Sequence, residues 1–172
     1  LRAGDYPGAL AGQRRALELA RRAGMGGDRI GLLLHNISGV QRRLGDLQGA
    51  LTTAEEALAA KRTALPSAHP DIALTLDAIG ILRRRLSDPA GAVRLHEEAL
   101  GIHERAFGPM HVRVGGTLNA LAQAYVLQGR LALGRSTYER ALAIWRSPGV
   151  RDLDALALAE MNLGDLLYQL ED

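Results

Sequence analysis

Two pairs of adjacent arginines are the residues of this sequence best suited to binding chemistry. Arg42-Arg43 and Arg84-Arg85 are separated by an interval of 42 in the sequence numbering. The guanidinium group is planar and always charged, and its parallel N–H groups match a carboxylate with two hydrogen bonds. If the two segments stack in the same orientation, the pairs form adjacent rows that could clamp an acidic side chain or a terminal carboxylate. The arginines therefore predict a partner that presents a carboxylate.

The same arginines also have an interpretation that involves no ligand. Each pair falls in the last turn of an expected helix, where the helix dipole stabilises a cation by about 0.3–1 kcal/mol. A guanidinium group at such a position is hydrated and needs no partner. The sequence leaves both interpretations open.

The histidines do not have the spacing of a metal or catalytic site. His69 and His111 are separated by the same interval of 42, but copies in successive repeats lie too far apart to share an ion, and no Cys or carboxylate cluster accompanies them. We expect both to stabilise loops by hydrogen bonding. His96 and His103 lack the H-E-x-x-H spacing, so a solvated or packing role is expected.

Other catalytic patterns are missing from the sequence as well. It contains no Gly-rich loop ending in Gly-Lys-Ser/Thr, no serine elbow and no convergent carboxylate pair. We therefore expect no enzymatic activity, no cofactor and no bound metal.

Composition favours a helical protein of the cytoplasm. Apolar residues make up 47% of the chain, with only one Trp, four Tyr and one Phe, so the core must be built from Leu and Ala between closely packed helices. The formal charge of +2 is too small to argue for direct nucleic-acid binding, and Lys61 is the only lysine. The sequence has no cysteine, no signal-peptide pattern and no apolar run of membrane-spanning length, so we expect no membrane contact.

An internal repeat organises the chain. Ala-Leu pairs recur at intervals of 41, 42 and 42, beginning at Ala16, Ala57, Ala99 and Ala141. Small residues recur at intervals of 42, at Ser38, Gly80, Ala122 and Gly164. Such agreement between separate positions indicates a stack of similar units, each of which buries its apolar face against its neighbours.

Each unit has the pattern of two helices joined by a tight turn. Leu76, Ile79 and Leu82 follow a helical period before the turn. Asp46 and Asp88 are placed to cap the second helix of their units. Eight helices are expected, over residues 5–23, 30–44, 47–64, 71–86, 89–106, 112–128, 131–146 and 153–170.

The repeats predict a single array over residues 1–172. Complete repeats are expected at 30–64, 71–106 and 112–146. Residues 1–24 match the second helix of a truncated repeat, and residues 153–172 match the first helix of another. We therefore expect a piece of a longer solenoid.

The repeated unit resembles the tetratricopeptide repeat (TPR), and its period and linkers are similar to the kinesin-light-chain type. The resemblance rests on Ala64–Leu82 and Ala106–Trp145, and the family's small residues fall on Gly80, Ala92, Ala99, Ala122, Gly134 and Ala141. Gln41 and Arg83 depart from the family, since they replace the aromatic residue represented here by Tyr125. The resemblance implies an all-α, right-handed superhelical solenoid of antiparallel helix pairs. It also implies a concave groove, lined by the first helix of each pair, that binds a peptide or protein segment.

The resemblance further implies which residues line this groove. Asparagine is useful there because its side chain both donates to and accepts from a peptide backbone, and Leu74 and Ile81 would add apolar area. The family's groove positions fall on His35, Asn36, Arg42, Arg43, Asp77, Ile81, Arg84, Arg85, Asn119, Gln123, Asn162, Asp165 and Gln169.

The function implied by the resemblance is a non-catalytic scaffold. Bacterial proteins with such repeats often carry them beside an NB-ARC nucleotide-binding module or a DNA-binding activator domain. The array would then be the sensor or assembly module of a larger signalling or transcriptional regulator. The alternative is a structural module that self-associates through its ends or faces without a peptide ligand.

Overall fold

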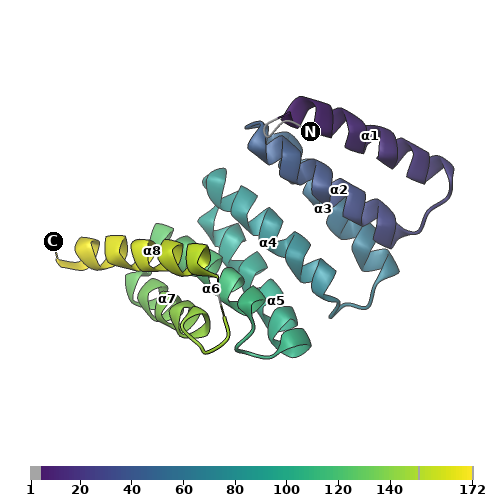
Figure 1. The fold of residues 1–172 in the computed structure, drawn as a ribbon. Coiled ribbons are helices and arrows are strands. Elements are labelled where there is room, and N and C mark those ends of the chain that lie inside the picture. Colours follow the sequence, from purple (N-terminus) through teal and green to yellow (C-terminus); the bar gives the residue numbers. More distant parts are fainter. Residues whose placement is uncertain (1–4, 151, 172) are drawn as a thin grey trace.

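The computed structural model describes residues 5–150 and 152–171, and within these ranges the chain forms eight α-helices and no strand. The expected all-α fold is confirmed. Figure 1 shows the helices stacked in chain order, with α1 and α8 at opposite ends. The helices are α1 (Tyr6–Arg22), α2 (Gly27–Arg43), α3 (Leu47–Ala64), α4 (Pro70–Arg85), α5 (Pro89–Phe107), α6 (Val112–Leu127), α7 (Leu131–Trp145) and α8 (Leu153–Glu171).

Helix α2 begins at Gly27, three residues before the expected start at residue 30. Of the glycines before it, Gly24 has a positive φ of 63°, while Gly26 is the extended N-cap residue. Gly27 is already helical and packs against α3, where an added Cβ would lie 2.6 Å from the carbonyl oxygen of Ala60. Gly24 therefore allows the turn, while Gly27 allows α2 to pack closely against α3.

Aspartates cap the second helices as predicted. The carboxylates of Asp46 and Asp88 accept hydrogen bonds from the backbone N–H groups of Gly49 and Gly91, at 2.9 and 2.8 Å. These bonds satisfy N–H groups that have no partner within the helix.

The repeated histidines cap the first helices. The side chain of His69 accepts a hydrogen bond from the backbone N–H of Asp71 at 3.1 Å, and that of His111 accepts one from Arg113 at 3.2 Å. The expectation that they stabilise loops is confirmed: each histidine is the last loop residue before a first helix, α4 or α6.

The first helices of the pairs form the inner side of the stack. The backbones of α2, α4, α6 and α8 approach one another in succession, whereas among the described helices α3, α5 and α7 approach only their chain neighbours. A stack curves toward the side on which its units approach most closely, so α2, α4, α6 and α8 line the concave face. Ion pairs join the second helices across the outer face, as between Arg62 and Glu98 at 2.7 Å.

Small residues allow the two helices of a pair to pack closely. A Cβ added to Gly80 would lie 2.6 Å from the ring of buried His96, and one added to Gly134 would lie 2.7 Å from Val126. Ala92, Ala99, Ala122 and Ala141 are fully buried. None of the helices in the described ranges is long and apolar enough to cross a bilayer.

Candidate binding groove

One face of α4 provides a continuous wall of the concave side. Leu74, Asp77, Ile81 and Arg84 follow one another at helical spacing and line two neighbouring pockets between α4 and the helices beyond it. The first, which we call the apolar pocket, lies between α4 and α6 and has a volume of about 240 Å³. The second, the polar pocket, extends from α4 across α6 to α8 and has a volume of about 250 Å³.

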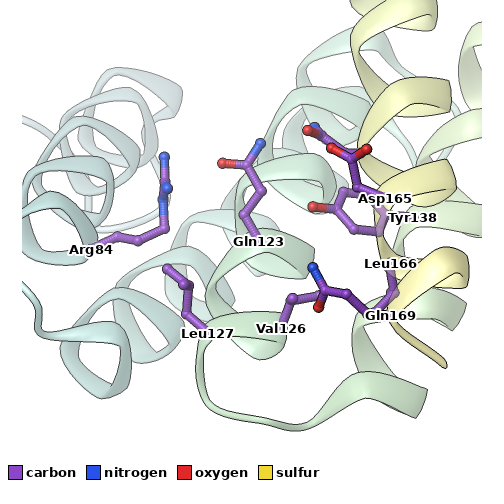
Figure 2. Close-up of a pocket in the computed structure, with 9 residues that line it drawn as sticks. Arg84, Gln123, Val126, Leu127, Tyr138, Asp165, Leu166 and Gln169 are labelled. Carbon is purple, nitrogen blue, oxygen red and sulfur yellow. The ribbon is translucent and has the colours of Figure 1, made fainter. Parts of the chain in front are cut away.

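The polar pocket brings together predicted residues from three first helices. Arg84 comes from α4, Gln123 from α6, and α8 provides Asn162, Asp165 and Gln169. Figure 2 shows Arg84 on one side of the pocket, Asp165 and Gln169 on the other, and Gln123 between them. The apolar part of the lining consists of Val126, Leu127 and Leu166.

Tyr138 is a pocket residue that sequence reasoning did not identify. It comes from α7, a second helix, and is almost completely buried, yet it contributes to the lining of the polar pocket. Burial raises the pKa of its hydroxyl to about 12, with Arg84 opposing the shift and Asp165 adding to it. The hydroxyl therefore stays neutral at physiological pH and can donate a hydrogen bond. The available signal was its place in the repeat, at an interval of 42 after His96.

Arg84 enters the pocket without an intramolecular partner for its charge. Its Nε atom is buried and has no hydrogen-bond partner, and no carboxylate of the described residues lies within ion-pair distance. Burial lowers the pKa of the guanidinium group, Tyr138 opposes this change, and Arg85 adds to it. A carboxylate bound from solution would satisfy both the charge and the donors.

The two arginine pairs do not share a pocket. Arg42 and Arg43 line a separate pocket of about 390 Å³ with His35, Asn36 and Tyr6, and Arg43 Nη1 donates to the Tyr6 hydroxyl at 3.4 Å. Arg85 is exposed and lies outside both the polar and the apolar pocket. The predicted clamp therefore has no single pocket: Arg42 and Arg43 both lie against α1, whereas Arg84 lies beside α6 and α8.

Asp77 lines the apolar pocket, but both of its oxygens are already engaged. Oδ1 lies 2.8 Å from Nδ1 of His96, and Oδ2 accepts a hydrogen bond from the Thr117 hydroxyl at 2.6 Å. Nδ1 of buried His103 lies 3.1 Å from the same hydroxyl. Asp77 thus joins α4, α5 and α6, and its expected role in ligand binding stays a prediction. Of the solvated and packing roles left open for His96 and His103, the structure shows packing, since both side chains are buried.

A related cluster joins the preceding unit to α4. Lys61 is 1% exposed, and its ammonium group donates to the carbonyl oxygen of Asp71 at 3.1 Å and to the Thr75 hydroxyl at 2.9 Å. That hydroxyl lies 3.5 Å from Nδ1 of His35. His35 therefore lies at a junction between units as well as beside the groove.

The predicted asparagines of α6 and α8 contact each other. Asn162 Nδ2 donates to Asn119 Oδ1 at 3.2 Å. The Nδ2 group of Asn119 and the Oδ1 atom of Asn162 can still contact a peptide backbone.

A tetratricopeptide repeat family model matches residues 1–63, 33–105 and 71–147. The matched segments overlap and together cover most of the chain. The chain belongs to the tetratricopeptide repeat family. The TPR fold is a scaffold for protein–protein interaction, and its members are in general non-catalytic.

Several solved structures have a fold similar to that of this TPR array. It is similar to BtubC (BKLC) from P. vanneervenii, with a TM-score of 0.89 and 23% identity over 98% of this chain and 68% of that one. A putative kinesin light chain of Podosopora anserina has a TM-score of 0.75 and 18% identity over 98% and 86%. The first TPR of Spaghetti (RPAP3), solved with the HSP90 peptide SRMEEVD, has a TM-score of 0.63 and 14% identity over 84% and 96%. No curated protein matches the sequence.

The TPR chain has no assembled metal site in the part that the structure describes, since no three His, Asp or Glu side chains are grouped to hold an ion. Its candidate site is a groove lined by hydrogen-bonding, charged and apolar groups.

The lowered pKa values of His35 and His103 predict that the array loses stability in mild acid. Burial is the main cause that lowers the pKa of His103, and Asp77 opposes this shift. Burial, followed by the charge of Lys61, lowers the pKa of His35. The unfolded chain therefore binds more protons once the pH falls below about 6.5, and stability decreases until the folded pKa values are passed. Urea unfolding at pH 7.5 and 5.5 is expected to show this loss, at most about 1.4 kcal/mol per pH unit for each histidine.

The variant His103→Gln provides the control for this pH dependence. It keeps a hydrogen-bonding group at the junction but cannot titrate, so the difference between the two pH values should become smaller. Equal stability of the unaltered protein at pH 7.5 and 5.5 would contradict the prediction.

Proposed function

We propose that this TPR array binds an extended peptide or protein segment along α4, α6 and α8, as a sensor or assembly module of a larger cytoplasmic regulator. The observation that carries the proposal is the polar pocket, which is lined by Arg84, Gln123 and Asn162 and in which Arg84 has no ion-pair partner among the described residues. Side-chain amides can bind a peptide backbone whatever its sequence, and an arginine adds selectivity for a carboxylate.

The adjoining apolar pocket supports a segment longer than a single residue. Leu74, Ile81 and Ala120 line it, and Gly116 leaves it open on α6. An extended segment along the α4 wall would place an apolar side chain here and a charged one beside Arg84. Because both pockets exist before the segment binds, the protein loses less conformational entropy on binding. The TPR of Spaghetti, which was solved with a peptide, gives the fold a precedent for this mode.

The arginines provide the test of the groove. Arg84→Glu combined with Arg85→Glu is expected to abolish the binding of acidic peptides, because the pocket then repels a carboxylate, while helicity and melting temperature stay unchanged. Peptides selected from a random displayed library would serve as probes, and fluorescence anisotropy would measure their binding. Arg105→Glu, an exposed arginine in the last turn of α5, is the matched charge control. Unaltered binding in the double variant would rule out this groove.

The wider role is part of the same proposal. The resemblance described above supports a bacterial signalling or transcriptional regulator in which the array stands beside an NB-ARC or DNA-binding domain. The sequence of the full-length protein tests this part, since a parent chain without any regulatory domain would overturn it.

Self-association is the second candidate function. It is supported by large apolar side chains that α8 exposes at Leu158, Met161 and Tyr168. Sedimentation equilibrium distinguishes the two functions: a dimer that Met161→Glu with Tyr168→Glu converts to a monomer, without peptide binding, would favour self-association.

A further inference from the structure

The polar pocket contains two opposite charges that are not paired with each other. Arg84 extends from α4 on one side and Asp165 from α8 on the other (Figure 2). Neither takes part in an ion pair among the residues that the structure describes. Arginines elsewhere on the surface do pair with carboxylates, as at Arg21, Arg62, Arg83, Arg135, Arg140 and Arg146.

The groups between these charges are suited to bind a polar segment rather than a purely apolar one. The Gln123 amide lies between Arg84 and Asp165, and Tyr138 lies on the Asp165 side with its hydroxyl directed into the pocket (Figure 2). An apolar ligand would leave the buried Nε of Arg84 without an acceptor and would remove water from the rest of the guanidinium group, which is unfavourable. A carboxylate beside Arg84 would accept from the guanidinium group and from the Tyr138 hydroxyl.

The second charge restricts the ligand further. Asp165 is exposed and repels a further acidic residue, while Arg84 in the same pocket repels a segment that carries only basic residues. Like charges brought together at an interface disfavour the wrong partners. A segment with one acidic and one basic residue can pair with both Arg84 and Asp165.

The ligand charges must enter one pocket from the same side of the segment, because Arg84 and Asp165 both line it. An extended chain advances by about 3.3 Å per residue, so the nearest side chains on one side are close together. Side chains two residues apart in an extended segment also point to the same side. Both charged side chains can therefore enter the pocket together.

We propose that the polar pocket selects an extended segment in which an acidic and a basic residue are separated by one residue. The acidic side chain binds Arg84 and Tyr138, and the basic side chain binds Asp165. This inference rests on the proposed function and defines the partner more narrowly, as a mixed-charge segment rather than an acidic one.

Selection from a displayed library of random 12-residue peptides tests the inference. The unaltered chain is expected to enrich peptides with acidic-x-basic or basic-x-acidic triplets. Asp165→Arg should shift the enrichment to peptides with two acidic residues at the same spacing. Asp154→Arg makes the same charge change at an exposed position of α8 outside the pocket, and it should enrich the same peptides as the unaltered chain.

The binding of individual peptides gives the size of the effect. For a fluorescein-labelled mixed-charge peptide from the selection, Asp165→Arg should weaken binding by roughly tenfold or more, since it replaces an attraction with a repulsion. Enrichment of acid-only peptides that Asp165→Arg does not change would overturn the inference while leaving the groove intact. Equal recovery from the unaltered chain and from Arg84→Glu would overturn the proposed function as well.

Discussion

Replacement of Asp77 by alanine is expected to lower the free energy of unfolding by about 2–4 kcal/mol. The carboxylate lies where three helices meet, with Nδ1 of His96 at 2.8 Å and the Thr117 hydroxyl at 2.6 Å. Its removal leaves Nδ1 of buried His96 without this partner, while the Thr117 hydroxyl can still donate to the carbonyl oxygen of Arg113 at 3.2 Å. An unpaired buried donor costs more than a typical hydrogen bond contributes. The loss should be visible in urea unfolding followed by circular dichroism.

Two further variants separate this network from a general effect of the substitution. Asp77→Asn keeps one acceptor oxygen and should cost less than Asp77→Ala. Asp154→Ala removes an exposed carboxylate from α8 and should change stability by no more than about 0.5 kcal/mol. If Asp77→Ala were as mild as Asp154→Ala, the junction would not depend on the carboxylate.

The second large effect is expected at Lys61, where glutamate should destabilise the array by about 3–5 kcal/mol. The lysine stem packs against Gly31, whose added Cβ would lie 2.5 Å from Lys61 Cγ. The ammonium group donates to the carbonyl oxygen of Asp71 and to Thr75. A glutamate cannot donate to that carbonyl, and its buried charge would face an oxygen.

Lys61→Met is the matched control because it preserves the length of the stem. It removes the ammonium group, but the Thr75 hydroxyl still donates to the carbonyl oxygen of Asp71 at 3.0 Å. A cost below about 1.5 kcal/mol is therefore expected. Thermal unfolding of both variants provides the measurement, and a methionine variant as unstable as the glutamate one would show that the ammonium group itself is indispensable.

Positions 61, 103 and 145 are equivalent in successive repeats but are occupied by lysine, histidine and tryptophan. Lys61 bonds to Thr75, and His103 bonds to Thr117, its equivalent one repeat later. Trp145 occupies the same position next in order and packs over Gly115, with 3.1 Å between an added Cβ and its ring. The threonine position there is Ala159, which is buried in an apolar cluster with Trp145. The fold therefore requires a filled junction but not a particular interaction.

The sequence by itself determined the features that depend on neighbouring residues. The repeat period, the helix order, the caps at Asp46 and Asp88 and the loop-stabilising role of His69 and His111 all arise from residue types at fixed places within each unit. Apolar spacing and small residues at fixed positions are read from the same local pattern. The early start of α2 was missed because a glycine-rich stretch signals a turn, while close packing against α3 is not visible locally.

Only the tertiary structure decided which side chains remain available to a ligand. The polar pocket combines side chains from four helices, between Arg84 and Gln169, and includes Tyr138 from the outer row. The same stacking supplies Asp77 with internal partners and leaves Arg84 without one. A repeat period places equivalent residues in rows, but the partner of each side chain depends on the residues that neighbouring units bring beside it. The groove chemistry is therefore a property of the stack rather than of any single repeat.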